Sequence, residues 1–292
     1  MSTVKVIKVN ENVFAANDRE ADDIREMCKR NKTFFVNVMS APGSGKTTML
    51  VSLINMLKDK YNILEMDVDI DTDLDARRVA EETGIPSVQI HNGGLCHIDA
   101  DMTSRALKNV NLAGVDLLIL ENIGNLVCPA EFDTGAHKKA MILSVPEGDD
   151  KPLKYPLMFT ISDLVIISKI DTVDFFEFDF AAARERILAL NPKAEIIEIS
   201  AKTGEGMDKL AGWFVKQIED IVVTIDRISS VSEEQAQSIT QVTTGSEQIS
   251  NVVQTNSATA EESAAASEEL SAQATAMKSL VSRFKLREAR KN

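Results

Sequence analysis

The sequence predicts an α/β fold, in which a doubly wound, mostly parallel sheet is followed by a long C-terminal α-helix of coiled-coil type. Apolar runs typical of buried strands alternate with helical stretches between residues 34 and 200, and this alternation indicates βαβ units. A glycine-rich loop follows the first of these runs. Beyond about residue 219 the apolar residues take the three-and-four spacing of a heptad repeat.

The N-terminal arm is expected to contain a short strand at residues 4–9 and one helix. Asn17 or Asp18 is the expected cap of that helix, which is expected to run to about Lys29. The whole chain is expected to divide into this arm (1–33), a phosphate-loop domain (34–218) and a helical tail (219–292).

Within the phosphate-loop domain, apolar runs and turn residues predict the order of the elements. Helices are expected from the glycine-rich loop to about Lys60 and over residues 77–82. Strands are expected at residues 34–38, 63–69, 87–90, 115–120, 141–145, 163–168 and 195–200.

The composition excludes several classes of protein. The 292 residues carry a formal net charge of −13, which argues against a surface built for nucleic acid or anionic membranes. Three cysteines are too few and too scattered for a disulfide scaffold. No apolar run approaches the roughly 18–20 residues that cross a bilayer, and the N-terminus has no apolar core of a signal peptide. A cytoplasmic protein is therefore expected.

The glycine-rich loop has the chemistry of a phosphate site. Gly43 and Gly45 allow backbone angles that strain residues with a Cβ atom, so successive N–H groups can point at one anion beside the helix N-terminus. Lys46 can reach the β- and γ-phosphates, and the Thr47 hydroxyl can hold Mg²⁺. The loop matches Gly-x-x-x-x-Gly-Lys-Ser/Thr except at Ser40, where the first glycine is expected. The expected phosphate-binding residues are Gly43, Ser44, Gly45, Lys46, Thr47 and Thr48.

Carboxylates close two other expected strands. Asp69 and Glu121 each follow an apolar run, and with Thr47 they are expected to hold Mg²⁺. The loop from Asp69 to Asp75 is either a metal and switch loop or a solvated turn with helix-capping acids. Gly124 stands where a switch loop carries its γ-phosphate-sensing glycine. The expected catalytic residues are Lys46, Thr47, Asp75, Glu121 and Gly124.

A later strand runs into Ser168-Lys169-Ile170-Asp171, which is close to the Asn-Lys-x-Asp guanine reader. The Asp171 carboxylate can accept hydrogen bonds from guanine N1–H and N2–H₂, and adenine offers no N1–H there, so the pattern favours GTP over ATP. Lys169 would cover the base, and Ser168 replaces the usual Asn. The loop Ser200, Ala201 and Lys202 is expected to back the guanine.

Two thiols and an imidazole lie in loops that each follow an expected strand: Cys96, His97 and Cys128. Such loops share one rim of a parallel sheet with the phosphate site. Thiolate and imidazole ligands suit Ni²⁺, Zn²⁺ or Cu rather than Mg²⁺ or Ca²⁺. The spacing alone leaves open that these are neutral buried cysteines. Cys28 has no Cys or His nearby and is expected to be a half-buried thiol.

These stretches resemble the HypB family of GTPases, which help to deliver nickel to nickel–iron hydrogenase. The resemblance covers residues from about 10 to 216 and rests on Ser40–Thr48, Asn92–Asp99, the segment 121–130, Ser144–Asp150 and Ser168–Asp171. It implies a doubly wound P-loop GTPase domain that hydrolyses GTP slowly as a switch and forms a GTP-dependent homodimer. It also implies a nickel or zinc site at Cys96, His97 and Cys128. The implied partners are a hydrogenase maturation protein and the hydrogenase large subunit.

Some members of that family carry an N-terminal nickel motif rich in Cys or His. Residues 1–33 contain one Cys and no His, so that site is not expected here.

The tail has a different composition. Residues 219–292 contain one glycine, no proline and no cysteine, and their narrow heptad seam needs partner helices. Residues from about 225 to 286 resemble the methylated helix of chemoreceptor cytoplasmic domains. By that resemblance Glu262 is a possible methylation site. The hairpin tip and the second arm of that family are missing, so a fused helix is the simpler interpretation.

Two alternatives to a hydrogenase-type nickel chaperone remain. One is a nucleotide-dependent chaperone of urease or cobalamin type on the same fold. The other is an interaction protein whose tail joins a chemoreceptor-like helical bundle.

Overall fold

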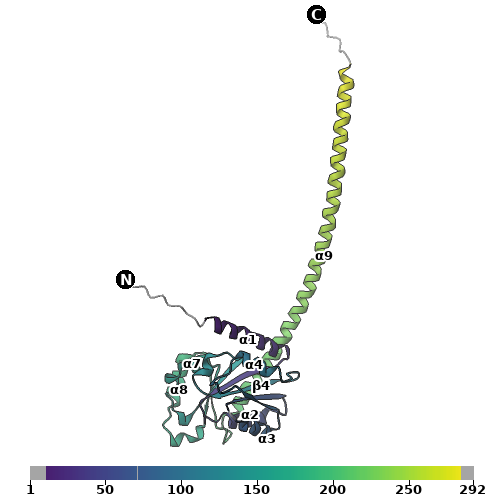
Figure 1. The fold of residues 1–292 in the computed structure, drawn as a ribbon. Helices are drawn as coiled ribbons and strands as arrows, with labels where there is room; N and C mark the ends of the chain where they lie inside the picture. Colours follow the sequence, from purple (N-terminus) through teal and green to yellow (C-terminus); the bar gives the residue numbers. More distant parts are fainter. Residues whose placement is uncertain (1–10, 71, 284–292) are drawn as a thin grey trace, which may run out of the picture. The chain divides into compact units, whose positions relative to one another are not determined.

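The computed structural model describes residues 11–70 and 72–283 (Figure 1). Within these residues seven strands form one sheet in the order β3-β2-β4-β1-β5-β6-β7, and every neighbouring pair is parallel. The expected doubly wound parallel sheet is therefore confirmed. The strands are β1 (Phe34–Ser40), β2 (Ile63–Asp69), β3 (Ser87–His91), β4 (Leu117–Gly124), β5 (Lys138–Ser144), β6 (Leu164–Ser168) and β7 (Glu195–Glu198). The strand expected at residues 4–9 lies outside the described residues.

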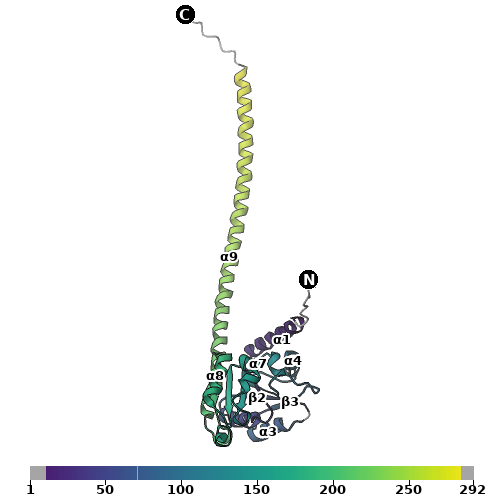
Figure 2. The ribbon, with the colours of Figure 1, turned by 90° about the vertical axis from the view of Figure 1, so that its left-hand side faces the viewer.

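Helices connect the strands and cover both faces of the sheet (Figures 1 and 2). The α-helices are α1 (Glu11–Arg30), α2 (Lys46–Leu57), α3 (Leu74–Thr83), α4 (Ala100–Leu107), α5 (Cys128–Glu131), α6 (Lys151–Lys154), α7 (Pro156–Ile161), α8 (Phe180–Leu190) and α9 (Met207–Ser282). Two 3₁₀ helices, η1 (Val145–Glu147) and η2 (Ile170–Phe175), complete the described elements.

The central strand β1 shows why the sheet is covered on both sides. Phe34, Val36 and Val38 are buried in one cluster with α2, α3 and the first turns of α9. Phe35 is buried in a second cluster with α1 and α4, and Met39 in a third with α7 and α8. Successive side chains of a strand point to opposite faces, so a continuous apolar run produces a core on each side.

The start of α1 corrects the expected cap. The helix includes residue 11, so Asn17 and Asp18 lie inside it rather than at its N-terminus. The Asn17 side chain bonds to the backbone of Ala100 and Asp133 instead of to its own helix. A polar residue suited to capping is here used for a tertiary contact, which local sequence patterns do not reveal.

Other boundaries also differ from those expected, most of all the start of the final helix. Helix α2 ends at Leu57 rather than near Lys60, and β4 extends to Gly124, beyond the expected end at residue 120. The final helix begins at Met207. Its Leu210, Phe214 and Ile218 are buried in the core of the phosphate-loop domain.

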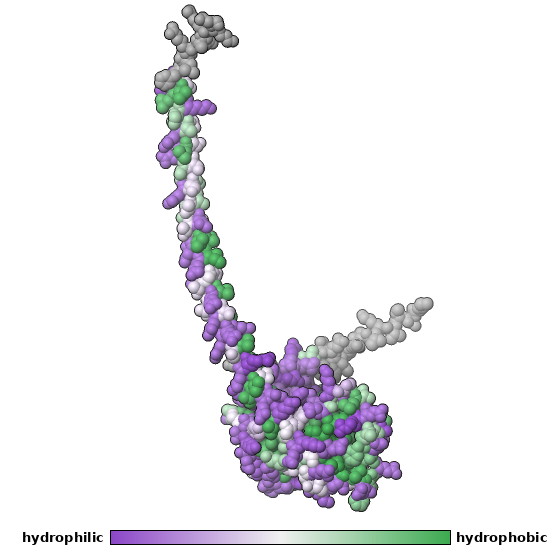
Figure 3. Space-filling view, turned by 180° about the vertical axis from the view of Figure 1, so that it is seen from behind, coloured by the Kyte–Doolittle hydropathy of each residue, from purple (hydrophilic) through white to green (hydrophobic). Residues whose placement is uncertain are grey.

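The chain divides into two compact units, Met1–Asp226 and Arg227–Asn292. The described part of the second unit is helix, and its large apolar side chains are exposed, as Figure 3 shows in green along the helix. They are Ile228, Val231, Ile239, Val242, Ile249, Val252, Val253, Leu270, Met277, Leu280 and Val281. None of the helices in the described ranges has both the length and the apolar character that a membrane crossing requires.

Candidate functional site

The loop between β1 and α2 adopts the backbone conformation that its glycines predict. Gly43 and Gly45 have φ values of 74° and 96°, in the left-handed region that favours glycine. Gly45 is the residue immediately before α2, so the N–H groups of the loop and of the first helical turn lie at one site. Ser44 in this loop and Thr47 in the first turn of α2 are both buried.

Gly124, which is predicted to be a switch-loop glycine, lies directly against the phosphate loop. Ser40 of β1 is in register with Gly124 of β4. A Cβ atom at Gly124 would lie 3.0 Å from Cα and 3.1 Å from N of Pro42. Because real Cβ atoms rarely approach backbone this closely, a side chain at residue 124 would displace the loop. The two segments are therefore packed too closely for any side chain at residue 124.

Thr47 and Glu121, both expected to hold Mg²⁺, are in direct contact. The Thr47 Oγ1 donates a 2.8 Å hydrogen bond to Oε1 of Glu121. Asp67 of β2 is in register with Glu121 on the adjacent strand, so the two side chains point to the same face of the sheet.

Glu65, Asp67 and Glu121 form a buried carboxylate group. Each offers an oxygen within 4.8 Å of the others, and the three residues are 0%, 3% and 2% exposed. Sequence reasoning missed Glu65 and Asp67, although their spacing of two along β2 places both on one face. Asp69 was expected with Glu121, but it lies two residues beyond the paired position, and its Oδ1 accepts a hydrogen bond from the Thr72 backbone.

Burial raises the pKa of all three carboxyl groups. The pKa of Glu65 rises to about 9, that of Asp67 to about 8 and that of Glu121 to about 7, in each case first because burial disfavours the charged form. The neighbouring carboxylates raise the pKa of Asp67 further, whereas Lys46 lowers it.

A hard cation fits this group. One oxygen of each carboxyl group is buried without a hydrogen-bond partner, and Glu65 uses its other oxygen to accept a hydrogen bond from Ser87. Carboxylate oxygens are the ligands that Mg²⁺ prefers, and a divalent charge would offset their repulsion.

Helix α3 brings two further groups to the phosphate loop. Asp75, in its first turn, is close enough that its charge raises the pKa of Glu121. Arg78, one turn on, donates a 3.2 Å hydrogen bond to the Thr48 hydroxyl. Sequence reasoning missed Arg78, because an exposed helical arginine has no distinctive spacing.

A cavity of about 250 Å³ lies between the phosphate loop and the predicted base-reading residues. Its lining includes Ser44, Gly45, Thr48, Met49, Ser168, Lys169, Asp171, Thr172, Ile199, Ala201 and Lys202. Seven of the predicted nucleotide residues therefore lie around one space, whereas Gly43, Lys46 and Thr47 are not part of its lining. Ser200 lies behind this lining, where its hydroxyl donates a 2.7 Å hydrogen bond to Asp171.

Ser168, which replaces the usual Asn, is hydrogen-bonded to the phosphate loop. Ser168 is buried, and its hydroxyl donates a 2.9 Å hydrogen bond to the Ser44 carbonyl. Lys169 donates a 2.7 Å hydrogen bond to the Gly43 carbonyl. The base-reading loop and the phosphate loop are thus joined at two points.

The three residues predicted to bind a soft metal lie near one another, but their ligand atoms do not all come close together. The Sγ atoms of Cys96 and Cys128 lie 2.7 Å apart, and Nδ1 of His97 lies 3.9 Å from Sγ of Cys96. The three side chains do not place all their ligand atoms within 4.8 Å of one another. The His97 ring stacks on Phe132, with ring centroids 3.9 Å apart and planes inclined by 7°.

The thiols interact with each other. The contact with Cys128 raises the pKa of Cys96, first because the hydrogen bond that the Cys96 thiol donates to Cys128 favours its protonated form. A bound soft cation would reverse that preference, since thiolates are its ligands. Asn125, between Gly124 and Cys128, donates a 3.3 Å hydrogen bond to the Cys96 carbonyl and so joins the two loops.

The remaining Cys and His residues have structural positions. Cys28 is buried in α1, where burial raises its pKa to about 12. His137 Nδ1 accepts a 3.0 Å hydrogen bond from the Phe35 backbone, and burial lowers the pKa of this histidine to about 4. His91 is exposed at the end of β3.

Residues 34–198 match the family model described as "CobW/HypB/UreG, nucleotide-binding domain". The chain is 41% identical over 213 residues to the hydrogenase maturation factor HypB of Rhizobium leguminosarum bv. viciae, covering 73% of this chain and 71% of the relative. It is 38% identical over 221 residues to a probable hydrogenase maturation factor HypB of Methanocaldococcus jannaschii, covering 76% of this chain and 100% of that one.

A solved structure agrees with the fold. The crystal structure of HypB from Helicobacter pylori in complex with nickel is similar with a TM-score of 0.67 and 38% identity. The similarity covers 70% of this chain and 96% of the other. The family model ends at residue 198 and leaves the exposed part of α9 outside its match.

Proposed function

Because this chain belongs to the CobW/HypB/UreG nucleotide-binding family and is a homologue of HypB, we propose that it is a GTP-hydrolysing metallochaperone. Its role is to assist nickel insertion into nickel–iron hydrogenase during maturation, with nickel as its cargo. A cytoplasmic location, a GTP-dependent homodimer, a maturation partner and the hydrogenase large subunit belong to the same proposal.

The proposed nucleotide site assigns one role to each group. Lys46 and the loop N–H groups stabilise phosphate charge, and Asp171 selects guanine. Thr47, Glu121 and Asp67 would hold Mg²⁺, which supplies charge neutralisation at the phosphates when bound. Asp75 and Gly124 belong to the loops that respond to the γ-phosphate.

One observation carries the proposal: a single segment connects the two sites. Glu121 contacts Thr47, and Gly124 lies against Pro42. Cys128, four residues beyond Gly124, contacts Cys96. A shift of this segment with the γ-phosphate would change the distance between the soft ligands, so nucleotide state and nickel affinity are expected to be coupled.

A metal-competition titration tests this coupling. Nickel affinity is measured with GDP and with a non-hydrolysable GTP analogue bound, and we expect the two values to differ about fivefold or more. Cys128→Ser is expected to weaken binding in both states. Equal nickel affinities with the two nucleotides would refute the coupling. Unchanged binding in Cys96→Ser and Cys128→Ser would favour the urease or cobalamin type of chaperone.

The exposed apolar side chains beyond Asp226 favour an additional interaction function. Large apolar residues repeated along one helix normally pack against other helices. We propose that the described part of the second unit, residues 227–283, pairs with other helices. Methylation of Glu262 is a further proposal, which mass spectrometry of the purified protein would test.

A further inference from the structure

Helix α1 contacts the chain shortly after each of the two thiols. The Asn17 side chain is half-buried and bonds to both of these segments. Its Oδ1 accepts a 2.9 Å hydrogen bond from the Ala100 backbone, just after the Cys96–His97 loop. Its Nδ2 donates a 3.0 Å hydrogen bond to the Asp133 carbonyl, just after the helix that begins at Cys128.

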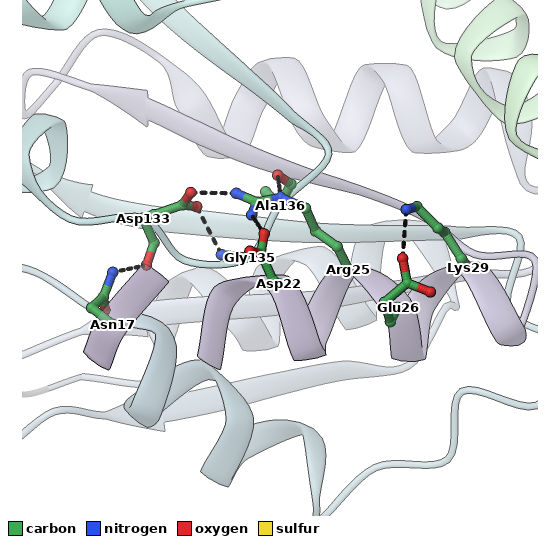
Figure 4. A network of polar contacts seen from close by, with 8 residues as sticks. All are labelled: Asn17, Asp22, Arg25, Glu26, Lys29, Asp133, Gly135 and Ala136. Carbon is green, nitrogen blue, oxygen red and sulfur yellow. Dashed lines mark hydrogen bonds and ion pairs between the residues drawn. The ribbon is translucent and has the colours of Figure 1, made fainter. Parts of the chain in front are cut away.

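Arg25 holds the second loop from the same helix (Figure 4). Its guanidinium forms an ion pair with the Asp133 carboxylate and donates a 3.3 Å hydrogen bond to the Ala136 carbonyl. The Asp133 Oδ1 accepts a 3.0 Å hydrogen bond from the Gly135 backbone. The turn at residues 133–136 is therefore fixed at several points.

Apolar packing brings α1 equally close to both loops. A Cβ atom at Gly135 would lie 2.6 Å from Cβ of Ile24. Ile98, the residue after His97, is fully buried in the same cluster as Ile24 and Ala136. The helix therefore has little freedom to shift over either loop.

The position of Asp133 also affects the imidazole. Phe132 immediately precedes Asp133, and its ring lies against the face of His97. The stacked Phe132 ring thus limits the orientations open to the His97 imidazole. Contacts that hold Asp133 in place therefore also limit the position of the adjacent Phe132 ring beside His97.

We propose that Asn17 is a positioning residue for the soft-metal site, in which one carboxamide ties the Cys96–His97 loop to the Cys128 segment. This inference rests on the proposed function of Cys96, His97 and Cys128 as nickel ligands. A carboxamide is the side chain that donates and accepts at once. Groups that orient metal ligands without touching the metal commonly control the metal affinity.

Two substitutions separate the two hydrogen bonds. Asn17→Asp keeps an acceptor for Ala100 N–H but cannot donate to the Asp133 carbonyl, and Asn17→Ala removes both bonds. The matched control is Asn109→Ala, because among the described residues the Asn109 carboxamide bonds to the Arg105 carbonyl one turn earlier in the chain. Nickel affinity is measured by chelator competition with GDP bound. Thiolate coordination is followed by charge-transfer absorption, and imidazole coordination by X-ray absorption spectroscopy.

We expect about tenfold weaker nickel binding in Asn17→Ala, with the thiolate band retained and the imidazole contribution reduced. Nucleotide affinity is expected to stay unchanged, because Asn17 contacts no nucleotide residue. Asn109→Ala should bind nickel like the unmodified protein. If Asn17→Ala does not fold, Asn17→Asp carries the same expectation.

Two outcomes would overturn the inference, and they differ in whether the proposed function survives. Wild-type affinity and spectra in both Asn17 variants would refute the positioning role, while a loss of binding in Cys128→Ser would leave the proposed function intact. Nickel binding without a thiolate band, unchanged in Cys128→Ser, would refute the proposed function and the positioning role together.

Discussion

Thr47 donates a 2.8 Å hydrogen bond to Glu121, although 74 residues separate them in the chain. The contact arises because β1 and β4 are neighbours in the sheet and α2 starts above their ends. It joins the first turn of the phosphate-binding helix to the strand that continues toward Cys128. This pair is therefore a sensitive place to test the nucleotide site.

Replacing Glu121 by Gln should slow GTP hydrolysis by about 100-fold at saturating Mg²⁺. The amide can still accept the Thr47 hydrogen bond, but it supplies no negative charge to a cation. Initial rates over a range of Mg²⁺ concentrations would check this. Thr160→Ala is a suitable control, because its hydroxyl bonds only to the Pro156 carbonyl within α7. Hydrolysis at the wild-type rate in Glu121→Gln would contradict the assignment.

The buried carboxylates predict an unusual pH dependence for protein freed of divalent cations. The raised pKa values of Glu65, Asp67 and Glu121 mean that the folded state holds protons that the unfolded state releases. The contribution of these three groups to the free energy of unfolding is therefore greatest below about pH 4 and is expected to fall as pH rises toward about 9. The free energy of unfolding falls by up to about 1.4 kcal/mol per pH unit for each such proton.

Urea unfolding with a chelator at several pH values would measure that slope. Glu65→Gln should flatten it, because one of the groups no longer titrates. Added Mg²⁺ should stabilise the protein more at pH 8 than at pH 5, since the cation competes with protons. A stability that rises between pH 5 and pH 8 in the chelated protein would contradict this account.

Asp171 and Ser168 should affect the nucleotide differently. Asp171→Asn loses a charged acceptor for the guanine edge, so GTP binding should weaken by about 10- to 100-fold relative to ATP. Ser168→Ala loses only the tie to the Ser44 carbonyl. It should weaken binding of both nucleotides about fivefold without changing their ratio. Competition with a fluorescent guanine nucleotide would give the ratio of GTP to ATP affinity in each variant. A loss of GTP selectivity in Ser168→Ala would contradict the prediction.

Deleting residues 227–292 should leave GTP hydrolysis and thermal stability nearly unchanged. The buried Leu210, Phe214 and Ile218 remain in the shortened chain, whereas the removed part exposes its apolar residues. A deletion that begins at Met207 removes those three core residues and is expected to prevent folding. Light scattering of the full and shortened chains would show whether the tail adds self-association. A drop in thermal stability on removing residues 227–292 would indicate that the tail supports the nucleotide domain.

Several contacts could not be predicted from local sequence patterns. Asn17 has the chemistry of a helix cap, but its partners Ala100 and Asp133 come from distant segments. Asp67, rather than Asp69, joins Glu121 because strand register decides which carboxylates are opposite. The His97 ring stacks on Phe132, 35 residues away, which no spacing predicts.

The sequence by itself determined the fold class, the phosphate loop and the strands that carry it, because strand periodicity and glycine conformation are local properties. It also predicted a guanine-reading loop and a pair of thiols in two separate loops, because the chemistry of these groups is contained in the residue types. Only the tertiary structure decided that Cys96 and Cys128 touch, which carboxylates share one buried group, and that α1 ties the two thiol loops together. These are matters of register and packing between segments distant in the chain, so they depend on how the whole sheet is assembled.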